Sequence, residues 1–176
     1  MLAARCAWMI LRAEHAQIRE LLASIGKALD AVQWNRPEPE ATQVRQLIGA
    51  LRSFDLTSHR PKGIALVEAL RGRSFEADQL IDALEHDREQ DDASLLRALA
   101  LLDDAARAGD AQAGAECAAV LKRYREGVLH HLEREDTALC AHSEDLLTEE
   151  EWSRVVSSIS SEVYVPGAHG GGTGPG

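Results

Sequence analysis

The chain has 176 residues, of which 45% are hydrophobic and only 4% aromatic, and its formal net charge is −10. So acidic a surface repels phosphate backbones and anionic lipid headgroups, which argues against nucleic acid or a membrane surface as the main partner. No apolar run is long enough to span a bilayer, and the length suits a single domain with a hydrophobic core.

Helix-forming residues dominate the chain, and its apolar residues recur at helical spacing. The first predicted helix covers residues 3–33, and Pro37 and Pro39 follow it. The second covers residues 40–70, where Pro61 is expected to kink or restart the helix. Its apolar stripe includes two polar positions, Asp55 and Ser58.

The third predicted helix covers residues 75–108, with Ser74 as its N-cap. The sequence AGD ends it, and Asp110 caps a fourth helix over residues 111–146. Four amphipathic helices with short links predict an all-α, up-down-up-down antiparallel four-helix bundle.

A short C-terminal helix is expected to follow the bundle. Thr148 and Glu151 form a predicted capping box for this helix, which runs to residue 160. We therefore expect one domain over residues 1–165 and a flexible glycine-rich tail over residues 166–176.

The sequence carries weaker signals for the cellular compartment and the oligomeric state. The three cysteines, Cys6, Cys117 and Cys140, are odd in number and show no paired spacing. This favours reduced thiols in a cytoplasmic protein. Exposed tryptophans on an acidic bundle are compatible with either a monomer or a homodimer.

Some polar residues lie on the apolar stripes, where an ordinary core has none. His15 is on the stripe of the first helix, and His131 and Glu135 are on that of the fourth. Burying an unpaired carboxylate is costly, so Glu135 needs a cation, a hydrogen-bond partner or solvent. Because His131 and Glu135 are four residues apart, they share one helix face and can supply ligands to one or two metal ions. An ordinary i,i+4 pair on the surface is the alternative.

The order of several short motifs resembles the hemerythrin-like (HHE cation-binding) family. AEHAQIRELL resembles its first-helix signature, SHRPKG a segment typically written H-H-P-K-E, HHLEREDTAL its fourth-helix H-x-x-x-E-D motif, and DLLTEEEW its closing helix. The resemblance implies a bundle whose metal ligands are His15, His59, His131 and Glu135.

Two departures from the family pattern concern the metal centre. Gly63 stands where the resemblance implies a second-helix carboxylate, and Arg88 stands where it implies a third-helix histidine. Asp91 lies one turn beyond Arg88 on the same stripe, whereas His86 should face solvent if the helix is regular. Gly63, Arg88, Asp91 and His86 are therefore candidates for lining the site.

Two hypotheses follow. In the first, three histidines and Glu135 bind zinc or non-haem iron, mononuclear or dinuclear. The resemblance then implies binding of O2, NO or peroxide, sensing, or iron handling. In the second, the site binds no metal, because Arg88 replaces a ligand and neutralises Glu135. The protein would then be a binding or regulatory module. The sequence does not decide between an enzyme and a non-enzymatic protein.

Overall fold

The structure, a computed structural model, describes residues 2–161, which are almost entirely helical and contain no strand. Among these residues, no helix is at once long enough and apolar enough to cross a bilayer. In chain order the elements are α1 (Leu2–Ala31), α2 (Glu40–Phe54), η1 (Asp55–His59), α3 (Arg60–Leu70), α4 (Phe75–Ala108), α5 (Ala111–Arg134), η2 (Glu135–Leu139), α6 (Cys140–Leu146) and α7 (Glu149–Ser161).

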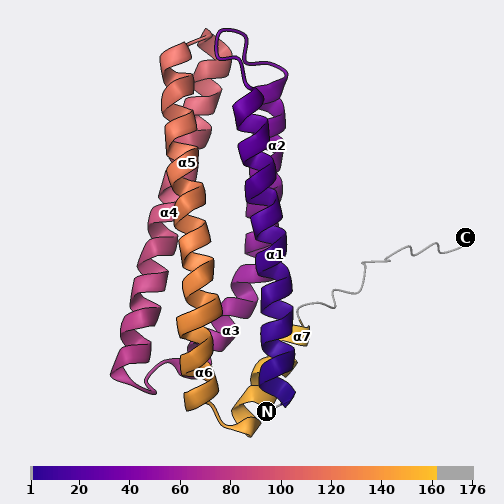
Figure 1. Ribbon diagram of the computed structural model, residues 1–176, viewed down its shortest axis with the longest axis vertical. Coiled ribbons are helices and arrows are strands. Elements are labelled where there is room, and N and C mark those ends of the chain that lie inside the picture. The colour runs from indigo at the N-terminus through magenta and orange to yellow at the C-terminus, as the bar shows by residue number, and fades with distance from the viewer. Residues whose placement is uncertain (1, 162–176) are drawn as a thin grey trace, which may run out of the picture.

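The long helices form the predicted up-down-up-down bundle (Figure 1). α1 packs against α2, and α4 against α5, while contacts between α1 and α5 and between α2 and α4 join the two pairs. α7 packs on α1 and α3, at the end of the bundle where the N-terminus lies. The predicted all-α fold with a short C-terminal helix is thus confirmed. The predicted tail, residues 166–176, lies outside the described residues, and so does the predicted domain boundary.

The predicted helix ends are confirmed by their hydrogen bonds. The Ser74 and Asp110 side chains accept hydrogen bonds from backbone N–H groups in the first turns of α4 and α5. Gly109, with φ of 63°, ends α4 in the left-handed conformation that glycine adopts readily. The Glu151 carboxylate accepts a hydrogen bond from the backbone N–H of Thr148 at 2.9 Å, as a capping box requires.

Two π-helical turns lie within the helices predicted over residues 40–70 and 111–146, and a kink had been expected only in the first, at Pro61. The expected break at Pro61 is the turn η1, in which the backbone N–H of Arg60 bonds to the carbonyl of Asp55, five residues earlier. The second turn, η2, divides the predicted helix over residues 111–146 into α5 and α6. A π turn inserts an extra residue into the helical repeat and occurs often at functional sites. His59 ends η1, and Glu135 begins η2.

The apolar core consists of two clusters that meet near the middle of the bundle. Along α1, Leu11 belongs to one cluster and Ile18 to the other. Leu132, before the start of η2, belongs to the cluster of Ile18, and Leu139, at the end of η2, belongs to the cluster of Leu11. Between the two clusters lie the buried polar residues His15, His59 and Glu135.

Candidate metal centre

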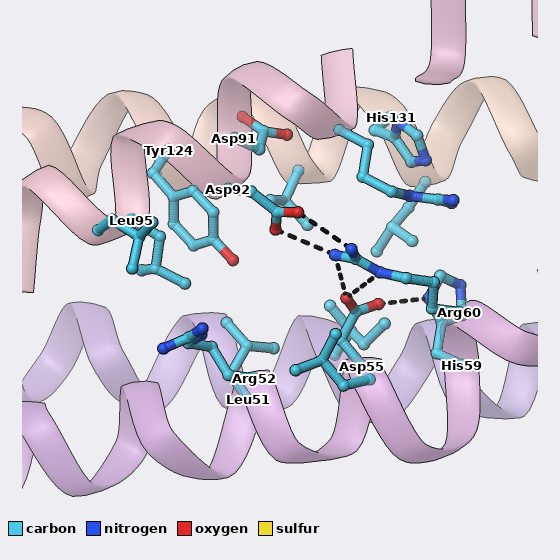
Figure 2. Close-up of a pocket in the computed structure, with 16 residues that line it drawn as sticks. Leu51, Arg52, Asp55, His59, Arg60, Asp91, Asp92, Leu95, Tyr124 and His131 are labelled. Carbon is cyan, nitrogen blue, oxygen red and sulfur yellow. Dashed lines mark hydrogen bonds and ion pairs between the residues drawn. The ribbon is translucent and has the colours of Figure 1, made fainter. Parts of the chain in front are cut away.

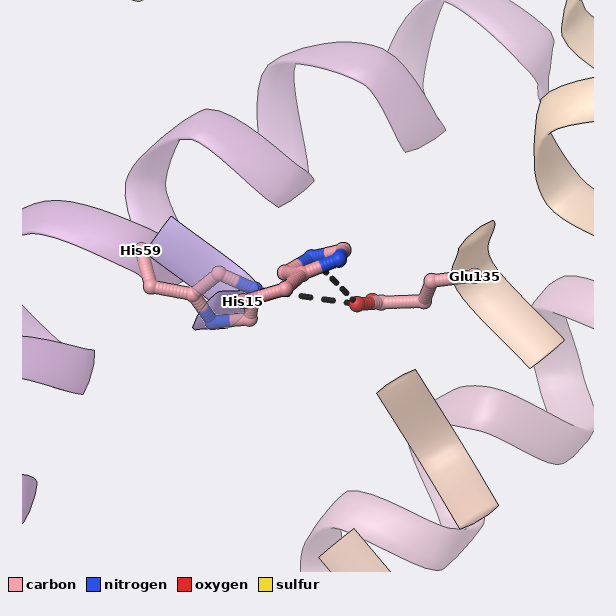
Figure 3. A group of neighbouring side chains, drawn as sticks. All are labelled: His15, His59 and Glu135. Atoms are coloured by element: carbon pink, nitrogen blue, oxygen red, sulfur yellow. Dashed lines mark ion pairs between the residues drawn. The ribbon is translucent and has the colours of Figure 1, made fainter. Parts of the chain in front are cut away.

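Three buried side chains from three elements converge between the apolar clusters (Figure 3). His15 comes from α1, His59 from η1 and Glu135 from η2. One potential ligand atom from each residue lies within 4.8 Å of those of the other two. Each residue reaches the centre from a different part of the chain, so the fold itself assembles the group.

The distances within this group match those between ligands of a single cation. Glu135 Oε2 lies 3.2 Å from His15 Nε2 and 3.6 Å from His59 Nε2. Two donor atoms bonded at about 2.1 Å to one ion are about 3.0 Å apart in octahedral and about 3.4 Å in tetrahedral geometry. His59 Nε2 and Glu135 Oε2 are both buried without a hydrogen-bond partner. Such groups are rare in protein interiors, and a shared cation would satisfy both.

Carboxylates hold both histidine rings in the orientation that metal binding needs. His15 Nδ1 lies 2.8 Å from Asp136 Oδ1, and His59 Nδ1 lies 3.0 Å from Asp55 Oδ1. An imidazole that donates its Nδ1–H to a carboxylate presents the lone pair of Nε2 on its other side. Carboxylate–histidine pairs of this kind typically orient metal ligands and make them more basic.

Arginines in turn hold these outer carboxylates. Arg19 donates to Asp136 Oδ2 at 2.7 Å, and Arg60 donates to Asp55 Oδ2 at 2.7 Å. Each carboxylate therefore uses one oxygen for a histidine and the other for a guanidinium. Because both oxygens are engaged, the imidazole planes are fixed before any ligand arrives.

The electrostatics of the cluster favour a negative Glu135 next to the positive charges of His59 and Arg88. Burial alone would raise the pKa of Glu135, but the neighbouring imidazoles of His131, His15 and His59 hold it well below its usual range. Burial opposes the charged form of His59 as well, yet the neighbouring carboxylates of Asp55 and Glu135 raise its pKa to about 9. Without a cation, the group thus holds a proton on His59 instead.

The second oxygen of Glu135 faces a different set of residues. His131 Nε2 lies 3.1 Å from Glu135 Oε1, and Arg88 Nη2 lies 3.5 Å from the same atom. The other ring nitrogen of His131, Nδ1, is buried and has no hydrogen-bond partner. The structure therefore places His131 beside the carboxylate, but not in the compact group that His15 and His59 form with it.

Gly63 and Arg88 occupy the part of the site where the sequence departs from the family pattern. Gly63 lines a small space together with His15, His59 and Glu135. A Cβ atom on Gly63 would lie 3.9 Å from Arg88 Nη2 and would meet no other atom within 4 Å. The Arg88 guanidinium thus reaches the region that a carboxylate at position 63 would enter.

The two other candidate residues on α4 do not reach the cluster. His86 is exposed, with its Nε2 2.7 Å from Gln90 Nε2, so it does not line the site. Its exposure agrees with the angle expected for a regular helix. Asp91 lines a larger neighbouring pocket, and burial raises its pKa to about 6.

A buried ion pair beside the centre was not predicted from the sequence. Lys62, only 2% exposed, forms an ion pair with Glu14 and donates hydrogen bonds to Ser58 Oγ at 2.8 Å and to the Ser58 carbonyl at 3.0 Å. Ser58 Oγ also donates to Glu14 Oε1 at 2.6 Å. The ion pair links α1 to the segment that carries His59. Only the polar Ser58 on an apolar stripe signalled it, because Lys62 and Glu14 resemble ordinary surface charges in the sequence.

Comparison with known proteins agrees with this geometry. A family model for the hemerythrin HHE cation binding domain matches residues 7–142, a span that contains the whole cluster. Searches of curated proteins and of solved structures each found no significant match. With more than half of its length matched, the chain belongs to the hemerythrin HHE cation-binding domain family.

Proposed function

We propose that this protein binds one non-haem metal ion through His15, His59 and Glu135. The observation that carries the proposal is the convergence of His15 Nε2, His59 Nε2 and Glu135 Oε2, two of which are buried atoms without hydrogen-bond partners. The carboxylates behind both histidines support it, because they fix the rings with Nε2 towards Glu135.

Iron is the metal that we propose. Two histidines and one carboxylate form the ligand set of many non-haem Fe(II) sites, although catalytic zinc also uses it. Three protein ligands leave coordination positions open, and a bound iron would supply redox chemistry and a place for O2, NO or peroxide there. We infer a role in binding or sensing such small ligands, or in iron handling. The free thiols of Cys6, Cys117 and Cys140 fit a protein of the reducing cytoplasm.

We propose a mononuclear site because Arg88 takes the place of a second cation. A guanidinium is permanently protonated and has no lone pair to offer a metal. Arg88 lies against Glu135 Oε1, the oxygen through which that carboxylate would reach a second ion. Gly63 supplies no carboxylate on the same side. His131 remains a candidate fourth ligand, and in the structure it contacts Glu135 Oε1.

The alternative function is a bundle that works without metal as a binding or regulatory module. The specific observation in its favour is that imidazole or guanidinium nitrogens already lie within 3.6 Å of both oxygens of Glu135. A protonated His59 and Arg88 would then neutralise the carboxylate.

Metal titration of the chelator-treated chain distinguishes the two. We expect anaerobic Fe(II), followed by competition with a chromogenic chelator, to bind one ion per chain. Removing a ligand in His59→Ala or Glu135→Gln should weaken binding by at least about 100-fold, more than the loss of an outer partner costs. His86→Ala, which removes an exposed histidine, is the matched control and should bind like the parent chain. Equal, weak binding by all four proteins would favour the metal-free module.

A further inference from the structure

A pocket of about 200 Å³ opens between α2, η1, α4 and α5, beside the metal cluster (Figure 2). His59 and His131 form part of its lining. One water molecule takes up about 30 Å³ in the liquid, so this volume exceeds what a diatomic molecule needs. The pocket therefore has room for a small organic molecule.

Apolar side chains form much of the pocket and of its rim. Leu51, Leu95 and Leu132 are buried residues of the lining. Leu56 and Leu96 also line it but are 51% and 55% exposed, an unusual position for leucine. An occupant with an apolar body would cover the exposed parts of these two side chains.

The charged groups of the pocket are paired or exposed, except Asp91, whose carboxylate lies against Gly127 of α5. Arg60 donates to Asp55 at 2.7 Å and to Asp92 at 3.0 Å, so it joins η1 to α4. Arg88 lies against Glu135, and Arg52 is exposed. Asp91 has no hydrogen-bond donor or ion-pair partner among residues 2–161, although it is half-buried in the lining.

Tyr124 lies beside this unpaired carboxylate. Its side chain is buried in the pocket lining, and its hydroxyl has no hydrogen-bond partner in the described part of the chain. Burial raises the pKa of Tyr124, and the nearby Asp91 raises it further, so the phenol stays neutral. A carboxylate next to an aromatic ring suits a ligand ammonium group.

We propose that this pocket binds a small amphipathic amine, with its ammonium group between Asp91 and the ring of Tyr124 and its apolar part on the surrounding leucines. The net charge of −10 favours the approach of a cation. A ligand there would lie against His59 and His131 and restrict access to the metal cluster from this side. Its binding does not require the metal, so it stands or falls independently of the proposed function.

Calorimetric titration of the full, chelator-treated chain tests the proposal with three probes of similar shape. These are 2-phenylethylamine, the neutral 2-phenylethanol and the anionic 3-phenylpropionate. We expect the amine to bind most tightly and Asp91→Asn to weaken it about tenfold, the value of one lost charge-assisted contact. Tyr124→Leu, which removes the aromatic ring, should weaken it by a smaller factor. Asp82→Asn, which removes an exposed carboxylate from the same helix, should leave binding unchanged.

A readout on the unmodified chain complements these variants. In two-dimensional amide NMR spectra, the amine should shift signals from the parts of α4 and α5 around Asp91 and Tyr124, and not those from α7. The proposal is overturned if the amine fails to bind, if the acid binds as tightly as the amine, or if the folded Asp91→Asn variant retains full affinity.

Discussion

Arg88 Nη2 lies 3.5 Å from Glu135 Oε1, while the other oxygen of that carboxylate faces His15 and His59. Glu135 thus lies between a group of potential metal ligands and a fixed organic cation. A carboxylate so placed can bridge two positive charges, and here the chain itself supplies one of them. In the proposed mononuclear site, Arg88 would supply the second positive charge at the position where the family resemblance implied a ligand.

Replacing Arg88 and restoring a carboxylate should create a second metal position. In the double variant Arg88→His, Gly63→Glu we expect two Fe(II) ions per chain, compared with one in the parent. A side chain at position 63 has room, since its Cβ would meet only Arg88, at 3.9 Å. Metal analysis after anaerobic loading and desalting measures the ratio.

The single variant Gly63→Glu is the control for this experiment. With Arg88 still present, the new carboxylate should pair with the guanidinium, and the ratio should remain one. If the double variant also stays at one ion per chain, Arg88 does not occupy a metal position.

Loss of the carboxylate behind His59 should weaken metal binding without removing a ligand. For Asp55→Asn we expect about a 10- to 100-fold loss of Fe(II) affinity, because the ring is less firmly oriented and less basic. Asp92→Asn is a matched control: both carboxylates accept from Arg60, but only Asp55 contacts His59. Competition titrations that give equal losses for the two variants would refute this role of Asp55.

Close packing at the loop end of the bundle predicts a contrast between two glycines. A Cβ on Gly114 would lie 2.3 Å from ring atoms of Trp34, so Gly114→Ala should lower the free energy of unfolding by about 1–3 kcal/mol. Gly49, in α2, has nothing within 4 Å of such a Cβ. Gly49→Ala should instead stabilise the protein by about 0.5–1 kcal/mol, because alanine favours the helix. Urea unfolding of both variants checks that the two changes in the free energy of unfolding have opposite signs.

The cap of α7 should make stability depend on acid pH. Hydrogen bonds with Thr148 and Arg73 lower the pKa of Glu151 to about 2. Because the folded-state pKa lies below the unfolded value of 4.5, this contribution is present above pH 4.5 and is lost as the pH falls towards 2. Glu151→Gln should reduce the melting temperature at pH 7 and flatten its fall between pH 4.5 and 2. An unchanged slope in thermal melts would contradict the assignment.

Helix positions and caps could be predicted from the sequence because they depend on local periodicity and a few residue types. Ser74, Asp110 and the Thr148–Glu151 capping box are all found in their expected roles. The two π turns could not be predicted, since they arise when long-range packing favours an added residue over regular hydrogen bonds. Pro61 signalled a break, but not its form.

The candidate site could be predicted only in part, because its geometry also depends on long-range packing. Helical spacing placed His131 next to Glu135, and family resemblance supplied His59, but neither specified which carboxylate oxygen each residue would face. The separation of His131 from the compact group depends on three-dimensional packing around η2. The ion pair of Glu14 and Lys62 was missed because charged residues are rarely buried, so burial of such a pair is seen only once the helices are assembled.

The number of metal ions per chain in untagged protein, purified from cells without added chelator, tests the central claim most directly. Elemental analysis, scaled to protein concentration by amino-acid analysis, should give about one ion per chain, with iron predominant. The same measurement on His59→Ala should give almost none. A value near two would contradict the role of Arg88 as a substitute cation. A folded parent protein without metal, unable to take up Fe(II) afterwards, would contradict the metal centre itself.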